Sequence, residues 1–131
     1  LERPEVVKLV ASKAYHGLTW KAGDIFQPWE ITGDAVVLAR VLHDWADPET
    51  LQILQHARAA LPAGGRLFVV EMVLPDSGFP GALCDLHLLI ATGGQERTEN
   101  AYRELMKKAD FSLSEIRRIP ALPCILVGVA Q

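Results

Sequence analysis

The hydrophobic pattern of the chain contains two continuous apolar segments, one over residues 35–42 and one over residues 66–74. The turn-favouring pair Gly33-Asp34 precedes the first segment, and Pro75 follows the second. A short apolar run between turn residues is typical of a strand that is buried on both faces of a parallel sheet. We therefore predict two central strands here. Further strands are predicted over residues 18–22, 112–119 and 124–130.

Apolar residues between these strands recur at the three- and four-residue spacing of helices. The clearest helix starts at Asp47, which we expect to be the N-cap, with Pro48 at the first helical position. Another helix is expected to follow Thr98, whose hydroxyl is suited to cap it. Two further helices are predicted over residues 6–14 and 83–91.

The alternation of strands and helices predicts one α/β domain with parallel βαβ units. We expect a sheet flanked by helices, with the last two strands paired antiparallel. A length of 131 residues suits a single domain. A content of 50% hydrophobic and 22% charged residues excludes a disordered tail.

Charge and cysteine content narrow the expected partners and compartment. The net charge of -3 argues against nucleic acid as the main partner. No apolar run approaches the ~20 residues that a membrane span needs, so we expect no membrane partner. Cys84 and Cys124 are too few for a disulfide framework and lack metal-ligand spacing, so we expect a reducing cytoplasm and no metal.

Polar side chains at the ends of the predicted strands are the candidates for chemistry, because ligands bind outside the carboxyl ends of strands in open α/β sheets. Asp24 follows the first strand, His43-Asp44 the second, and Glu71 lies near the end of the third. Imidazole ordinarily titrates near neutral pH, so His43 is the best candidate for a general base. The alternative is a capping or hydrogen-bonded histidine. Glu71 lies in an apolar run and must be paired, functional or solvated at the strand end.

Six ordered segments carry a resemblance to a known family. They are ERPEVV (2–7), GDIF (23–26), LARVLHDWAD (38–47), PAGGRLFVVE (62–71), DLH (85–87) and TGGQERT (92–98). Together they resemble the S-adenosylmethionine-dependent O-methyltransferases of the acetylserotonin and caffeate type, and more closely the bacterial members of secondary metabolism. The resemblance implies a Rossmann-like class I methyltransferase fold. It also implies that residues 1–131 are the C-terminal portion of the catalytic domain, without its first strand and glycine-rich cofactor loop.

The resemblance implies roles for individual residues. His43 matches the base that deprotonates the substrate hydroxyl, and Glu71 and Glu96 match the two carboxylates that flank it. The residues that match the site for the cofactor, S-adenosyl-L-methionine, are Glu2, Gly23, Asp24, Ile25, Phe26 and Arg40. Those expected to bind the acceptor substrate are Asp44, His87, Leu88 and Ala91.

The reaction implied is transfer of the cofactor's methyl group to a phenol-like hydroxyl of a small molecule. It needs no metal, because the sulfonium already makes the methyl electrophilic. A homodimer formed through an N-terminal domain outside this chain is also implied, and the isolated chain is expected to be inactive without that part. Two alternatives stay open: a non-catalytic homologue or fragment with a structural or interaction role, and an N- or C-methyltransferase of the same fold.

Overall fold

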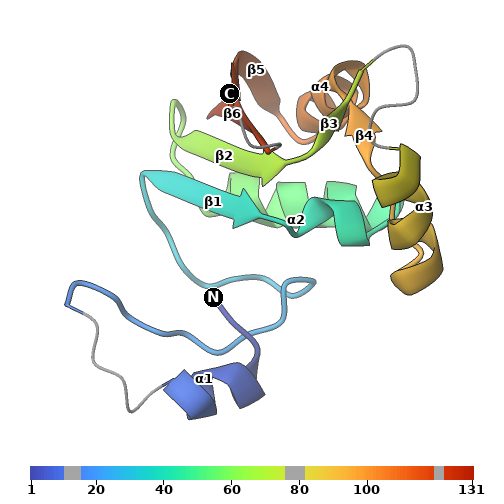
Figure 1. The fold of residues 1–131 in the computed structure, drawn as a ribbon. Coiled ribbons are helices and arrows are strands. Elements are labelled where there is room, and N and C mark those ends of the chain that lie inside the picture. Colours follow the sequence, from blue (N-terminus) through green and yellow to red (C-terminus); the bar gives the residue numbers. More distant parts are fainter. Residues whose placement is uncertain (11–15, 76–81, 120–122) are drawn as a thin grey trace.

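The computed structural model describes residues 1–10, 16–75, 82–119 and 123–131. A four-stranded sheet with the strand order β1-β2-β6-β5 forms the centre of the main body (Figure 1). Its strands are β1 (Ala35–Ala39), β2 (Arg66–Glu71), β5 (Phe111–Arg118) and β6 (Cys124–Ala130). β1 and β2 run parallel, whereas β6 runs antiparallel to both β2 and β5. A second sheet pairs the short strands β3 (Val73–Leu74) and β4 (Arg97–Thr98) in parallel.

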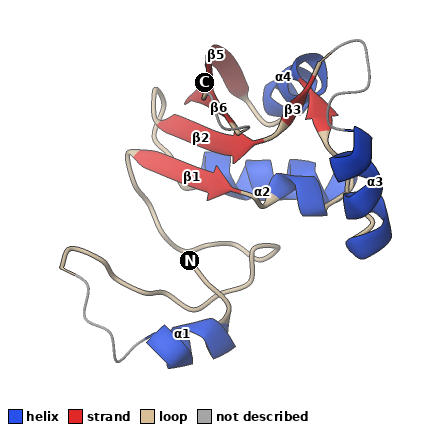
Figure 2. Ribbon diagram, in the orientation of Figure 1, coloured by secondary structure: helices blue, strands red, loops and turns tan. Residues whose placement is uncertain are grey.

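Helices connect and flank these strands (Figure 2). They are α1 (Pro4–Val10), α2 (Asp47–Ala59), α3 (Ala82–Ala91) and α4 (Glu99–Lys108), with a short 3-10 helix, η1 (Leu42–Asp44). α2 and α4 pack against each other, and buried residues of both belong to the same core as those of the main sheet. α1 has no buried residue and lies apart from the sheet on the N-terminal segment (Figure 1).

Strand β2 connects the core to the candidate site. Its side chains alternate in burial, with Leu67, Val69 and Glu71 fully buried on one face. The two aliphatic side chains pack in the core, where burial of each contributes roughly 1.5–3 kcal/mol. The same alternation places the carboxylate of Glu71 inside the protein at the carboxyl end of the strand.

The predicted antiparallel terminal pair is confirmed, and Cys124–Ala130 forms the last strand as expected. The expectation of a mainly parallel sheet is wrong, because β6 inserts between β2 and β5 and opposes both. The strand predicted over residues 18–22 is also wrong. Ala22 makes only an isolated parallel bridge to Glu2, and Leu18 is 51% exposed, so the alternation there does not reflect a buried face.

The limits of three other elements differ from the prediction. The first apolar segment ends as a strand at Ala39, and the second is divided at Met72, after which β3 leaves the main sheet to pair with β4. The N-cap of α2 is Ala46, so Asp47 is the first helical residue and not the cap. Thr98 caps α4 as predicted, since its side chain accepts a hydrogen bond from the amide of Ala101. Of the helix predicted over residues 6–14, positions 11–14 lie outside the described residues.

Candidate active site

A sharp turn after β1 positions His43. Arg40 adopts a φ of 56°, a left-handed conformation that is uncommon for residues other than glycine. Its amide donates to the carbonyl of Val70 at 3.0 Å, so the turn remains attached to β2. The chain then enters η1, whose middle residue is His43, only 3% exposed. The turn therefore places a buried imidazole beside the end of β2.

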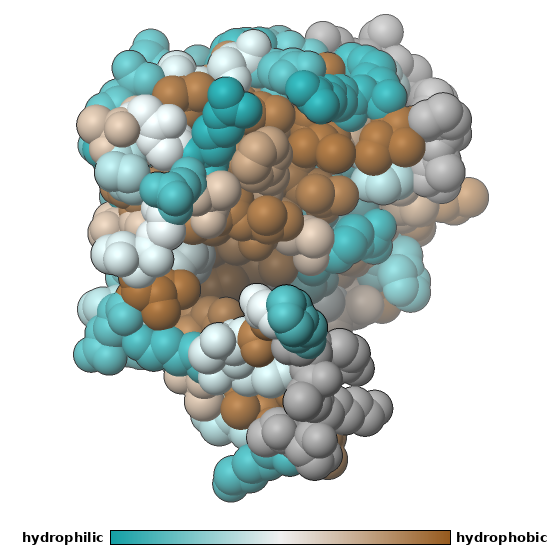
Figure 3. Space-filling model, turned by 90° about the vertical axis from the view of Figure 1, so that its left-hand side faces the viewer, coloured by the Kyte–Doolittle hydropathy of each residue, from teal (hydrophilic) through white to brown (hydrophobic). Residues whose placement is uncertain are grey.

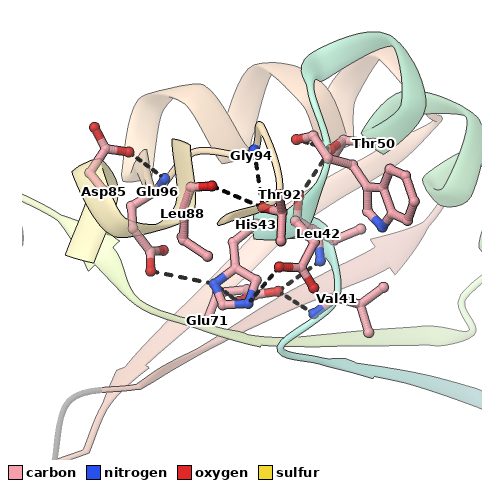
Figure 4. Close-up of polar contacts among 12 residues, drawn as sticks. Val41, Leu42, His43, Thr50, Glu71, Asp85, Leu88, Thr92, Gly94 and Glu96 are labelled. Carbon is pink, nitrogen blue, oxygen red and sulfur yellow. Dashed lines mark hydrogen bonds and ion pairs between the residues drawn. The ribbon is translucent and has the colours of Figure 1, made fainter. Parts of the chain in front are cut away.

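Glu71 anchors this turn and contacts the imidazole at the same time. Its Oε1 accepts hydrogen bonds from the amides of Val41 and Leu42, each at 2.9 Å. Its Oε2 lies 3.4 Å from Nδ1 of His43 (Figure 4). Burial raises the pKa of the Glu71 carboxyl above its ordinary value, and the neighbouring imidazole and the two amide hydrogen bonds partly oppose that rise. One carboxyl group thus holds the backbone of the loop and orients its histidine.

A second carboxylate approaches the same ring nitrogen from the other side of the loop. Oε1 of Glu96, a residue 5% exposed, lies 3.4 Å from Nδ1 of His43. The amide of Glu96 donates to Oδ1 of Asp85 on α3 at 2.7 Å. The other ring nitrogen, Nε2, lies 3.8 Å from Oδ1 of Asp44. Because two carboxylates face Nδ1, the arrangement favours a proton on Nδ1 and leaves the lone pair on Nε2.

The loop before β4 packs its backbone directly on η1. The amide of Gln95 donates to the carbonyl of His43 at 2.9 Å. A Cβ atom added to Gly94 would lie 2.0 Å from that carbonyl oxygen and 2.8 Å from Cα of Asp44. Only glycine permits this approach. The close approach at Gly94 therefore brings Glu96 within reach of the imidazole.

Replacing Gly94 with alanine is expected to force this loop away from η1. The clash is with backbone atoms, which cannot rotate away, so we expect a loss of about 1–3 kcal/mol in the free energy of unfolding. Urea titration of the full-length protein measures this change. Gly33→Ala is the matched control, because a Cβ there meets its nearest atom at an ordinary 3.6 Å. Equal stability of the two variants would contradict the close packing of this loop.

A cavity of about 900 Å³ lies between the N-terminal segment and β1 (Figure 3). Apolar side chains gather around this hollow on the face that Figure 3 shows. All six residues predicted to bind the cofactor contribute to its lining: Glu2, Gly23, Asp24, Ile25, Phe26 and Arg40. Asp44 and Trp45 line it as well, so the cavity extends to the loop that carries His43.

The walls of the cavity combine aromatic rings with carboxylates. Phe26 and Trp45 meet edge to face with their ring centroids 4.7 Å apart. Asp24 is exposed, and its Oδ1 accepts the amide of Phe26 at 2.9 Å, which fixes the loop between them. The amide of Gly23 donates to the carbonyl of Glu2 at 2.9 Å and joins the two segments of the wall. Such a cavity suits a ligand with a flat ring and with hydroxyl or amino groups that donate to carboxylates.

The predicted acceptor-binding residues are only partly brought together. Asp44 lies at the cavity beside His43. Leu88 is buried on α3, whereas His87 and Ala91 are exposed on the same helix, and none of the three is part of the cavity lining. The structure therefore brings His43, Glu71 and Glu96 together and gathers the six cofactor residues around the cavity, with Asp44 next to both groups. It does not place His87, Leu88 or Ala91 at the cavity.

Two residues of the site were not identified from the sequence. Arg97 is 3% exposed and binds the loop around His43 with its guanidinium group. Thr50 is fully buried, and its hydroxyl reaches the carbonyls of Leu42 and Trp45 at 3.2 and 3.3 Å. Both side chains donate hydrogen bonds to backbone carbonyls of the loop around His43. Any residue type can supply a backbone carbonyl, so the spacing of residues in the sequence does not predict these contacts.

Comparison with family models matches residues 2–112 to the O-methyltransferase domain. The chain therefore belongs to the O-methyltransferase domain family. It is 42% identical over 116 residues to the O-demethylpuromycin-O-methyltransferase of Streptomyces alboniger, a match that covers 84% of this chain and 31% of that protein. It is 40% identical over 96 residues to the phenazine O-methyltransferase of Lysobacter antibioticus, which covers 72% of this chain and 28% of that protein. The chain thus spans less than a third of the length of these two relatives.

A solved structure shows the same fold. The crystal structure of human N-acetylserotonin methyltransferase in complex with S-adenosylmethionine has a TM-score of 0.84 to this chain at 29% identity. The similarity covers 98% of this chain and 39% of that one. The family and the class I methyltransferase fold expected from the sequence are therefore confirmed. Within the part of the chain that the structure describes, no helix has the length and apolar character to span a membrane.

Proposed function

We propose that this chain binds S-adenosyl-L-methionine in the cavity beside β1 and supports transfer of its methyl group to a hydroxyl group of a small molecule, with His43 as the general base. The observation that carries the proposal is the buried imidazole of His43, whose Nδ1 faces Glu71 and Glu96 while Nε2 lies beside Asp44 at the cavity. Membership of the O-methyltransferase family supports the same reaction.

The residues of the cavity fit this cofactor. The carboxylates of Glu2 and Asp24 would accept hydrogen bonds from its hydroxyl and amino groups, and the rings of Phe26 and Trp45 supply apolar surface for its adenine. When bound, S-adenosyl-L-methionine supplies a methyl group on a positively charged sulfur. Binding of both reactants at one site supplies proximity and orientation, which account for the larger part of such a rate enhancement.

His43 would move the proton of the acceptor hydroxyl. With Nδ1–H directed at the carboxylates, Nε2 carries the lone pair that accepts this proton. The imidazolium that forms is stabilised by the negative charge shared between Glu71 and Glu96. The role of the two carboxylates is therefore to set the tautomer of the base and to stabilise its charged form.

Replacing Asp24 with alanine in the full-length protein is expected to weaken cofactor binding more than catalysis. Loss of a hydrogen bond to a charged group corresponds to about 1.5–3 kcal/mol, so we expect the KM of the cofactor to rise about tenfold or more with kcat little changed. Calorimetric titration with S-adenosylhomocysteine and steady-state kinetics measure the two effects. Glu104→Ala, which removes an exposed carboxylate on α4, is the control. An unchanged cofactor affinity in Asp24→Ala would leave Asp24 with a role in the turn only.

The same titration separates this proposal from the alternative of a non-catalytic module. A structural or interaction module would retain no measurable affinity for S-adenosylhomocysteine in the full-length protein. Retention of His43, Glu71 and Glu96 in one buried cluster favours the enzyme. The homodimer implied by the family resemblance and the cytoplasmic location inferred from the cysteine content stay predictions.

A further inference from the structure

Arg97 makes three charge-assisted contacts from an almost fully buried position. Nη1 donates to the carbonyl of Leu42 at 2.9 Å, and Nη2 donates to the carbonyl of Trp45 at 2.7 Å. Nε donates to Oδ1 of Asp47 at 2.9 Å. The residue is 3% exposed, so these partners replace the water that a guanidinium group otherwise binds.

The two carbonyls lie on either side of the histidine. Leu42 precedes His43 directly, and Trp45 follows the Asp44 that ends η1. The planar guanidinium, with donors in a fixed fork, therefore joins the start of the loop to its end. A lysine at this position would present a single ammonium group and could not reach all three acceptors in the same geometry.

Sequence adjacency and strand pairing also connect Arg97 to both carboxylates of the site, Glu71 and Glu96. It follows Glu96 in sequence, and it pairs with Val73 in the register between β4 and β3. Val73 lies two residues after Glu71, so the β3–β4 pair joins the segments that carry the two carboxylates. One short parallel pairing thus fixes Glu71, Glu96 and the guanidinium relative to the loop that bears His43.

We propose that Arg97 is a positioning residue for His43. By closing the loop from Leu42 to Trp45, it keeps Nδ1 toward the two carboxylates and Nε2 toward Asp44, a residue that lines the cavity. Asp47, 60% exposed in its side chain, balances the buried charge from the solvent side. This inference rests on the proposed role of His43 as the base, but it makes a claim about the orientation of the ring that can be measured separately.

The test uses Arg97→Lys in the full-length protein. We expect kcat to fall about tenfold, with the KM values of cofactor and acceptor changing less than about twofold, because the ring is misplaced while the cavity is intact. In nitrogen NMR spectra, the His43 ring should change from a single Nδ1-protonated tautomer to a mixture of tautomers. The kcat–pH profile should shift in the same variant. Arg103→Lys, which alters an exposed arginine on α4 paired with Glu99, should change none of these readouts.

Unchanged ring signals and an unchanged pH profile in Arg97→Lys would overturn the proposal. Should this variant fail to fold, Asp47→Ala provides the second test, because it removes one partner of the guanidinium, together with the side-chain contact of Gln95, and leaves both carbonyl contacts of Arg97 in place. We expect about a two- to fivefold fall in kcat and the same mixture of tautomers, and a wild-type spectrum would overturn the proposal. The spectrum reports ring orientation whether or not His43 is the base. If His43→Ala leaves kcat unchanged, the proposed role of His43 as the base is wrong. The NMR spectrum of Arg97→Lys still tests whether Arg97 orients the His43 ring.

Discussion

Replacing His43 with alanine in the full-length protein lowers kcat by about 100-fold or more and leaves cofactor affinity unchanged. The expectation follows from the loss of the only imidazole that two buried carboxylates orient among the described residues. General-base catalysis typically contributes about 10²–10⁴-fold, so the remaining rate would reflect proximity alone. Steady-state kinetics and calorimetric titration with S-adenosylhomocysteine separate the two effects. His16→Ala, which alters an exposed histidine in the N-terminal segment, is the matched control.

The loss in His43→Ala should depend on pH. A phenolic acceptor has an ordinary pKa near 10, so it needs a base at neutral pH but is increasingly ionised in more alkaline solution. The difference in kcat between the wild type and the variant should therefore shrink as the pH rises toward the pKa of the acceptor. A loss that is the same at every pH would indicate that His43 positions the substrate and does not accept its proton.

Changes at Glu71 should separate its two roles. Glu71→Leu removes the acceptor for the amides of Val41 and Leu42 and leaves one donor buried and the other part-buried. An unsatisfied buried donor costs about 1–3 kcal/mol, so we expect a loss of about 2–5 kcal/mol in the free energy of unfolding. Glu71→Gln can still accept from both amides, so stability should be largely retained while kcat falls, because no carboxylate at position 71 faces Nδ1. Urea titration and kinetics of both variants test this division, and equal stability of the two would contradict it.

The pH dependence of stability provides a further measurement on Glu71→Gln. Because burial raises the pKa of Glu71 in the folded chain, the folded state binds its proton more tightly than the unfolded state. The resulting stabilisation is complete below the ordinary value of 4.5 and is lost as the pH rises through the raised value. The wild type should therefore lose stability relative to Glu71→Gln across this range, by about 1.4 kcal/mol for each tenfold change in the ionisation equilibrium. If the free energies of unfolding of the wild type and Glu71→Gln change in parallel with pH, burial of the carboxyl group has no net effect on its pKa in the folded chain.

Local patterns predicted most of the fold. The apolar runs identified the two adjacent strands β1 and β2, and Thr98 marked the start of α4. Strand order and direction depend on pairing between distant segments, and the insertion of β6 between β2 and β5 has no local signal. The segment at residues 18–22 shows the opposite error, because its alternation of apolar and polar residues is not accompanied by burial.

The sequence predicted the residues of the candidate site but not the contacts that hold these residues in place. His43, Glu71 and Glu96 lie together as the resemblance implied. Glu71 ends β2, Glu96 directly precedes β4, and His43 lies in η1 after β1. The contacts that hold them were missed because they involve the backbone. Gly94 acts by having no side chain, and Arg97 binds carbonyl oxygens and a carboxylate fifty positions away in sequence. His87 and Ala91 match the family motif in sequence, yet they are exposed on α3.

The most direct test of the proposed reaction follows a labelled methyl group. The full-length protein is incubated with S-adenosyl-L-methionine carrying carbon-13 in its methyl group and with a panel of small phenols, and the product is identified by NMR. We expect the label to appear as a methyl ether on oxygen, and His43→Ala to form the same ether about 100-fold more slowly at neutral pH. A label bound to nitrogen or carbon, or an ether formed equally fast by His43→Ala, would contradict the proposed reaction.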